Sequence, residues 1–317
     1  MKSVCEILGT KYPIIQGAMA RIAEYNLASA VSNGGGLGII AAGGESADWL
    51  RDQIKKVRER TDKPFGVNIM LLADNVDELM DVVCEEKVPV VTTGAGNPGK
   101  YIARLKEAGI TVIPVLANVT LATRVARNGA DAVVAEGTEA GGHIGETTTM
   151  ALVPQMADAV DIPVIAAGGI ADGRGIAAAY MLGAQGVQVG TRFLVAEECI
   201  VAQGYKDAII KAKDSSTVAT GRATGHPVRV IKNKLAKRIL DLEKNNGDLE
   251  EINRLCTGTL AAAVRDGDAD NGNIMSGQIA GLVKKEQKAA EIIEEMFKEA
   301  EKIYEDRNRI CRAGRTV

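Results

Sequence analysis

The chain has 317 residues, of which 46% are hydrophobic and 25% charged, and its formal net charge is −3. This length suffices to bury a substantial core, as one large domain or two smaller ones. The slight negative charge argues against nucleic acid as a partner, because proteins that bind phosphate backbones carry a cationic excess.

The cysteines and the apolar runs indicate a cellular compartment. The five cysteines lie far apart and form no Cys-x-x-Cys pair: Cys5, Cys84, Cys199, Cys256 and Cys311. The N-terminal segment lacks the layout of a signal peptide, and no apolar run reaches the roughly 18 residues that span a bilayer. We therefore expect a cytoplasmic protein with reduced thiols and no membrane contact.

Eight short apolar runs follow one another along the chain, and each is typical of a strand that is buried on both faces. They start at Pro13, Gly36, Pro64, Val88, Thr111, Ala130, Ile162 and Ala184. Segments of helical period separate them, and the clearest is 98–109, with Pro98 near its start and Gly109 at its end. The same pattern predicts helices over 74–87, 120–130 and 172–184, the last with Met181 on its apolar face.

This alternation predicts an α/β fold, a closed (β/α)8 barrel, because strands that are roughly 20 to 30 residues apart leave room for one helix each. An open doubly wound sheet is the alternative, but the runs number eight and no Gly-x-Gly-x-x-Gly follows the first. After the eighth strand this rhythm stops. We expect an inserted, mostly helical domain over 198–270, with 1–197 and 271–317 forming the barrel.

The chain ends in a predicted amphipathic helix that should pack on the barrel. Its apolar stripe consists of Ala289, Ile292, Ile293, Met296, Ala300 and Ile303.

In such a barrel, binding and catalysis take place at the carboxyl ends of the strands. The seventh and eighth predicted strands end at Gly168-Gly169 and Gly190-Thr191. Glycines there let backbone N–H groups face an anion, which favours a phosphate-bearing ligand, although tight turns alone would also use glycine. Asn68 and Glu136 end two other strands and suit the mixed donor and acceptor edge of a flavin, although a capped or solvated strand end explains either residue equally well.

His143 is one of two histidines, and it lies on the glycine-rich loop 141–145 beyond the sixth strand. An imidazole gives or takes a proton near neutral pH, so His143 is the candidate acid or base; a solvent-exposed bystander is the alternative. The sequence contains no metal-ligand cluster, no Gly-x-Ser-x-Gly and no Walker loop.

The motifs QGAM, GVNIM, EGTEAGGHIG, AAGGI and VGTRF make the chain resemble the flavin mononucleotide (FMN) barrel family that holds nitronate monooxygenase (2-nitropropane dioxygenase) and enoyl-acyl-carrier-protein reductase II. Two later stretches, GRATGHPVRVIKNKL and GNIMSGQIAGLV, are similar to the reductase branch in particular. The resemblance implies FMN as cofactor and His143 as the catalytic histidine. The implied FMN contacts are Ala18, Met19, Asn68, Glu136, Gly168, Gly169, Gly190 and Thr191, with Met275, Ser276, Gly277 and Gln278 on its outer side.

The implied reaction is the reduction of a trans-2-enoyl thioester on acyl carrier protein, in fatty acid elongation, with NADH or NADPH as co-substrate. A hydride would reach the β-carbon through the flavin, and His143 would protonate the α-carbon or polarise the thioester carbonyl. The basic stretch from Arg222 to Arg238 would dock the acidic carrier protein, unless it is a solvated helix face. Some relatives respond to a monovalent cation, for which no site is identifiable, and we expect a homodimer.

Two other functions fit the same residues. In a nitronate monooxygenase, the histidine would take the α-proton of a nitroalkane and O2 would reoxidise the flavin. A barrel that stores or senses flavin without turnover is the second alternative. Neither the preferred nicotinamide nor the acyl length can be read from the sequence.

Overall fold

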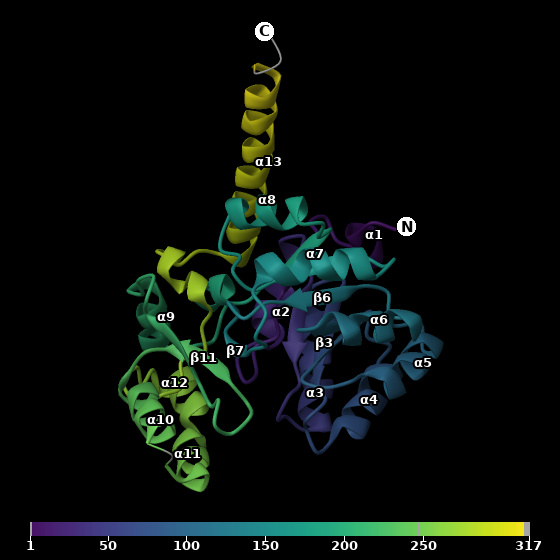
Figure 1. Ribbon diagram of the computed structural model, residues 1–317. Helices are drawn as coiled ribbons and strands as arrows, with labels where there is room; N and C mark the ends of the chain where they lie inside the picture. The colour runs from purple at the N-terminus through teal and green to yellow at the C-terminus, as the bar shows by residue number, and fades with distance from the viewer. Residues whose placement is uncertain (1, 246, 314–317) are drawn as a thin grey trace.

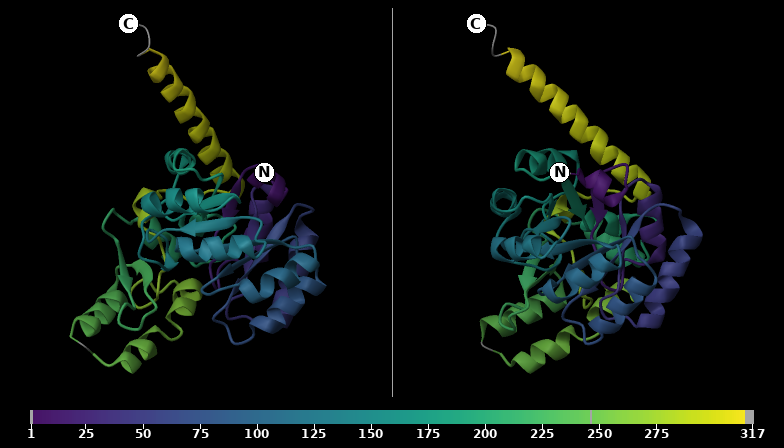
Figure 2. Two further views of the ribbon diagram at one scale, coloured as in Figure 1. Left: turned by 45° about the vertical axis from the view of Figure 1, so that its right-hand side comes forward. Right: turned by 90° about the vertical axis from the view of Figure 1, so that its right-hand side faces the viewer.

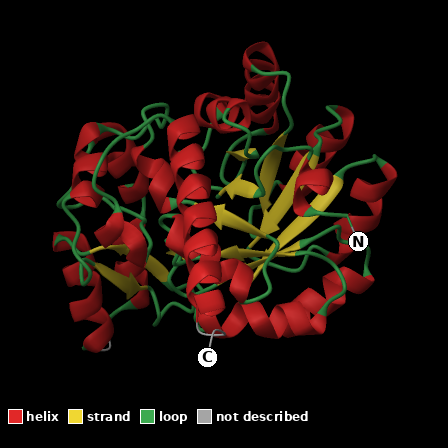
Figure 3. Ribbon diagram, turned by 90° about the horizontal axis from the view of Figure 1, so that it is seen from above, coloured by secondary structure: helices red, strands yellow, loops and turns green. Residues whose placement is uncertain are grey.

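The computed structural model describes residues 2–245 and 247–313, with side chains to residue 306. Eight parallel strands form the predicted (β/α)8 barrel, with the strand order β1-β9-β8-β6-β5-β4-β3-β2 (Figure 3). A parallel bridge between Ile15 and Leu37 joins the two ends of this order. The barrel strands are β1 (Ile14–Gln16), β2 (Gly38–Ala41), β3 (Phe65–Met70), β4 (Val90–Gly94), β5 (Thr111–Leu116), β6 (Val133–Glu136), β8 (Val164–Ala167) and β9 (Gly186–Val189).

The strands are apolar throughout because both of their faces are covered. One set of side chains fills the barrel interior, and helix α1 (Val4–Leu8) contributes Val4 and Leu8 to the same cluster. The alternate set packs under the outer helices, as Ile14, Ile40 and Val67 do. Gln16 completes the junction of β1 and β2, since its Oε1 accepts a hydrogen bond from the amide of Ile39 at 3.0 Å.

Helices cover the outside of the barrel (Figure 1). They are α2 (Tyr25–Asn33), α3 (Ala47–Arg60), α4 (Val76–Glu85), α5 (Gly99–Glu107), α6 (Val119–Arg127), α7 (Thr149–Ala159) and α8 (Gly173–Met181). The four predicted helices are confirmed as α4, α5, α6 and α8. The placement of Met181 on the buried face is wrong: its side chain is 75% exposed at the final turn of α8.

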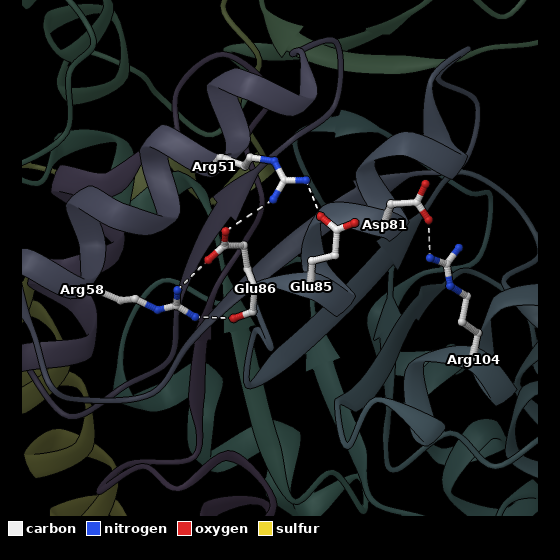
Figure 4. Close-up of polar contacts among 6 residues, drawn as sticks. All are labelled: Arg51, Arg58, Asp81, Glu85, Glu86 and Arg104. Carbon is white, nitrogen blue, oxygen red and sulfur yellow. Dashed lines mark hydrogen bonds and ion pairs between the residues drawn. The ribbon is translucent and has the colours of Figure 1, made fainter.

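Ion pairs join α3, α4 and α5 on the surface (Figure 4). Arg51 pairs with both Glu85 and Glu86, and Arg58 pairs with Glu86 at 2.7 Å. Arg104 of α5 pairs with Asp81 of α4.

The final helix α13 (Ala289–Ala313) takes the position of the eighth barrel helix, against α8 and α2, and its last turns project from the body (Figure 2). The Phe297 ring stacks on Tyr12 with centroids 4.8 Å apart, and Glu299 Oε2 accepts from the amide of Gly173 at 2.8 Å. The predicted stripe is buried from Ala289 to Ala300, and Ile303 is half-buried. The expectation that this helix packs on the barrel is confirmed.

The long excursion between β9 and α13 combines short helices with a two-stranded hairpin. It follows η1 (Thr191–Val195) and consists of α9 (Gln203–Ile210), β10 (Thr217–Thr220), β11 (Val228–Ile231), α10 (Lys234–Lys244), α11 (Leu249–Cys256), α12 (Thr259–Asp266) and η2 (Gln278–Leu282). The hairpin β10–β11 is a feature that the sequence did not suggest. Part of the basic stretch therefore lies in a strand, and only its end lies in α10.

The side chains of this excursion belong to two hydrophobic clusters. Leu235, Ile239 and Ile252 form a small cluster between α10 and α11, whereas Tyr205 and Ile209 of α9 belong to the main core of the barrel. Entry and exit meet where Ala196 bridges Gln287. The segment 272–282 contacts both parts, so the division at residue 270 stays a prediction.

The described cysteines Cys5, Cys84, Cys199 and Cys256 are free thiols; the side chain of Cys311 lies outside the described part. Within residues 2–245 and 247–313, no helix is long and apolar enough to cross a bilayer.

Candidate active site

A cavity of about 220 Å³ lies over the carboxyl ends of the barrel strands. The predicted site residues that line it are Ala18, Met19, Asn68, Glu136, His143, Gly168, Gly169, Gly190, Thr191, Met275 and Gly277. Ser276 and Gln278 are not among the lining residues, because Ser276 is fully buried and Gln278 is exposed to solvent. The structure therefore brings most of the predicted site together, while the roles of these residues stay predictions.

The turn after β8 has the backbone shape that an anion requires. Gly168 and Gly169 both adopt positive φ, +86° and +74°, a conformation that only glycine takes readily. A β-carbon at Gly168 would lie 2.9 Å from the carbonyl oxygen of Gly137. Among the described residues, no acceptor is hydrogen-bonded to the amide of Gly169. This amide is free to bind a phosphate oxygen.

The segment that carries Met275 and Gly277 is fastened across the mouth of the barrel. The amide of Gly277 donates to Thr191 Oγ1 at 2.8 Å, and the amide of Gln278 donates to the carbonyl oxygen of Glu139 at 2.9 Å. Tyr205 of the excursion donates its hydroxyl proton to the Met275 carbonyl at 2.8 Å. Both the barrel and the excursion thus fix this wall of the cavity.

His143 lies in a strand, which corrects the expectation of a glycine-rich loop. Gly142–His143 forms β7, which pairs antiparallel with β11 so that His143 faces Val228 (Figure 1). The amide of Ile144 donates to the Pro227 carbonyl at 3.1 Å and extends this pairing. Because Val230 of β11 also bridges Met275, one strand positions both His143 and the outer wall.

Gly141 explains why glycine precedes the histidine. A β-carbon there would lie 2.7 Å from the carbonyl carbon of Ser276 and 2.8 Å from the amide nitrogen of Gly277. Any larger residue would push the two segments apart. The glycine therefore allows the histidine strand and the outer wall to cross in contact.

Burial changes the protonation of two lining residues in opposite directions. It raises the pKa of Glu136 to about 7, because the carboxylate is removed from water. It lowers the pKa of His143, and the charge of His226 lowers it further. No described side chain is hydrogen-bonded to Glu136, so its carboxyl group is available to a ligand. Both effects on His143 favour its neutral form.

Asn68 is oriented by its neighbour on β4. Its Nδ2 donates to Thr92 Oγ1 at 2.9 Å, which leaves its carbonyl oxygen for a donor in the cavity. Asn68 and Glu136 thus supply the mixed hydrogen-bonding groups that the sequence predicted.

Several lining residues were not predicted as site residues, and those with longer functional side chains include Met70, Glu139 and Gln188. Gln188 could have been found from the sequence, because it is the single polar residue in the apolar strand β9. Its side chain is buried. Glu139 binds the start of α7, where its carboxylate accepts from the amide and the hydroxyl of Thr149 at 2.9 Å each. Met70 and Glu139 lie within the motifs GVNIM and EGTEAGGHIG, but neither was assigned a role.

No metal centre accompanies this cavity in the part of the chain that the structure describes. No group of three or more His, Cys, Asp or Glu side chains stands where a metal ion could bind.

Comparison with known proteins assigns the family. The sequence profile of the nitronate monooxygenase family matches residues 2–82 and 71–299. The chain belongs to the nitronate monooxygenase family. Members of this family are flavin-dependent, and this protein is accordingly a flavin-dependent oxidoreductase. The residues fit such a cofactor, since the cavity joins a glycine cradle to the unpartnered carboxyl group of Glu136.

Three relatives in this family illustrate its range. The structure of FabK from Thermotoga maritima has a TM-score of 0.95 and 48% identity, over 98% of this chain and 99% of that one. A probable nitronate monooxygenase of Staphylococcus saprophyticus is 37% identical, over 95% of this chain and 98% of its own. A nitroalkane oxidase of Streptomyces ansochromogenes has a TM-score of 0.85 and 30% identity, over 95% of this chain and 98% of that one.

Proposed function

We propose that the protein is an FMN-dependent enoyl-acyl-carrier-protein reductase of bacterial-type fatty acid elongation, which uses NADH or NADPH. The observation that carries this proposal is the 48% identity with FabK, an enoyl-acyl-carrier-protein reductase II, over nearly the full length of both chains. The identity to the nitronate monooxygenase and nitroalkane oxidase relatives is 37% and 30%.

Different lining residues would contact different parts of FMN. The amides at Gly168-Gly169 and Gly190-Thr191 would bind its phosphate, and Asn68 and Glu136 would bind the polar edge of its ring. Met275 and Gly277 would close its outer side. When bound, FMN would supply the hydride chemistry between the nicotinamide and the β-carbon of the enoyl thioester.

His143 would act on the other end of the double bond. A neutral imidazole carries one N–H, which can donate a hydrogen bond to the thioester carbonyl and polarise it. The same nitrogen can deliver the proton that the α-carbon needs. Pairing of β7 with β11 holds the ring at the cavity, so that the group is oriented before substrate arrives.

The proposal includes a basic surface that would dock the acidic carrier protein. Only some of the basic residues between Arg222 and Arg238 would be available for this contact. Arg222, Lys234 and Arg238 pair with Glu146, Asp270 and Glu251, so their charges are largely neutralised. Arg229 is buried and donates to the Thr138 carbonyl. Lys232 and Lys237 are exposed without an ion-pair partner among the described residues, and they are the cations through which docking would act.

A stopped-flow flavin assay tests the proposal. The FMN-loaded protein is mixed anaerobically with NADH or NADPH and then with a four-carbon enoyl thioester. We expect rapid bleaching of the flavin and rapid reoxidation by the thioester. His143→Ala should retain flavin reduction and lose enoyl reduction. Bleaching without reoxidation by any enoyl thioester would exclude the reductase.

Nitronate monooxygenase is the second candidate, because the family profile and the Staphylococcus relative carry that name. It predicts O2-dependent turnover of alkyl nitronates in place of enoyl reduction. A barrel that only binds flavin would show no bleaching by either nicotinamide.

A further inference from the structure

The chain contains two histidines, and the pairing of β7 with β11 brings them near each other beside the cavity. His226 ends the turn of the β10–β11 hairpin, and His143 faces Val228 on the neighbouring strand. The Ile144 amide donates a hydrogen bond to the Pro227 carbonyl, so the antiparallel pairing of His143 with Val228 continues for one more residue. His226 therefore lies on the same face as Val228, diagonally across from His143.

Such diagonal neighbours in an antiparallel pair are about 7–8 Å apart, within reach of two imidazoles or of one bridging water. Both rings are exposed to solvent, and His143 also lines the cavity. His226 lies at the hairpin tip and is not among the lining residues.

Most of the charged side chains around His143 and His226 make hydrogen bonds or ion pairs with other residues. Arg222 pairs with Glu146 at 2.6 Å, and Glu243 of α10 accepts from the amide of Ala223 at 2.9 Å. Arg229 and Glu139 are bonded to Thr138 and Thr149. Glu136 lines the cavity. Among the described residues, no carboxylate is hydrogen-bonded to either imidazole, and Glu136 is the other titratable group that is free at the cavity.

We propose that His143 and His226 form a proton relay, in which His226 takes a proton from solvent and passes it to His143, directly or through one water. This inference rests on the proposed reductase function. Bound FMN would supply the hydride, which comes from reduced nicotinamide and forms the new C–H bond at the β-carbon. The π-electron pair of the double bond moves to the α-carbon and there forms a C–H bond with the proton of one His143 ring nitrogen. As that N–H bond breaks, the other ring nitrogen gains a proton from His226, so that His143 stays neutral. Solvent then restores the proton of His226.

The relay would connect His143 to solvent through a second ring. Burial lowers the pKa of His143, and the charge of His226 lowers it further, which favours the neutral imidazole. His226 is exposed, so it is in contact with the water from which the proton comes.

A kinetic experiment tests the relay on the full-length, FMN-loaded protein. The reduced enzyme is mixed with crotonyl thioester, and flavin reoxidation is followed for the wild type and for His226→Gln. We expect the variant to be about 10- to 100-fold slower, toward the lower end of what positioned proton transfer contributes. Flavin reduction by nicotinamide should be unchanged, and added free imidazole should restore part of the lost rate.

Lys213→Gln is the matched control, because Lys213 is exposed just before β10 and should react at the wild-type rate. Wild-type reoxidation by His226→Gln across pH 6 to 9 would overturn the relay. Failure of the wild type itself to be reoxidised by the thioester would instead overturn the proposed function.

A second experiment needs no turnover. With two histidines in the chain, an NMR titration resolves both imidazole signals. His226→Gln should raise the titration midpoint of His143, and His143→Gln should shift that of His226. Midpoints that stay unchanged in both variants would show that the rings do not interact.

Discussion

The backbone amide of Gly277 donates a hydrogen bond to the Thr191 hydroxyl oxygen at 2.8 Å, across 86 positions of the chain. Thr191 begins the turn after the last barrel strand, and Gly277 belongs to the segment over the mouth. This buried bond is the direct link between the expected phosphate cradle and the outer wall of the cavity.

Thr191→Val should loosen that wall. The substitution keeps the shape of the side chain but leaves the buried Gly277 amide unpaired, which costs about 1–3 kcal/mol of unfolding free energy. We expect a lower urea midpoint and weaker FMN binding, measured by fluorescence quenching. Thr191→Ser keeps the hydroxyl and should retain most of both. Equal losses in the two variants would show that the methyl group matters and the hydrogen bond does not.

Gly141→Ala should separate the histidine strand from the outer wall. Its β-carbon would lie 2.7 Å from the Ser276 carbonyl carbon, so the backbone must shift. We expect a loss of about 1–3 kcal/mol, the usual cost of overpacking, in urea unfolding of the flavin-free protein. Gly94→Ala is the control, because a β-carbon at Gly94 meets no atom within 4 Å. If the Gly141→Ala protein were as stable as this control, the close contact between Gly141 and the Ser276–Gly277 backbone would be contradicted.

Glu136→Gln should change how stability depends on pH. Burial raises the pKa of Glu136 from 4.5 to about 7, so the native state favours the protonated carboxyl. Its contribution is complete below pH 4.5 and is lost as the pH rises through 7, by about 3 kcal/mol at most. The amide of Gln cannot ionise. The flavin-free variant should therefore gain stability over the wild type at pH 8 and not at pH 4.

Urea unfolding at both pH values measures this difference. Glu146→Gln, at an exposed position, should keep the pH dependence of the wild type. A parallel decline in wild type and Glu136→Gln would show that Glu136 is solvated.

Glu86→Gln should have a small effect that depends on salt. Glu86 binds Arg51 and Arg58 on the surface of α3 and α4, where water screens the charges (Figure 4). Exposed pairs contribute about 0.2–1 kcal/mol each. We expect a loss of about 1 kcal/mol at low salt that largely disappears in 1 M NaCl. Asp62→Asn, at an 85% exposed side chain, should be neutral, and a loss for Glu86→Gln that persists in high salt would indicate packing.

The barrel could be predicted because its signals are local. Each strand is an apolar run closed by a polar or glycine residue, and parallel strands place those ends at one edge. His143, Asn68 and Glu136 could thus be assigned to one mouth before any contact was known.

The sheet β7–β11–β10 could not be predicted, because its decisive pairing is long-range. A strand of two residues has no periodicity, and β11 lies within a basic stretch that resembles a helix. The proximity of His143 and His226 depends on this pairing. Side-chain direction was equally hidden at Ser276 and Gln278, since it depends on where the η2 turn begins.

Because α13 follows the excursion in the chain, the ring of barrel helices can close only after the excursion has been synthesised. This helix fills the last place in the barrel ring, yet the chain must first make the entire excursion. During synthesis on the ribosome, the apolar surfaces of α8 and α2 that α13 covers stay open to water until α13 emerges. The nascent barrel is thus exposed to chaperones and to aggregation until that helix has been made.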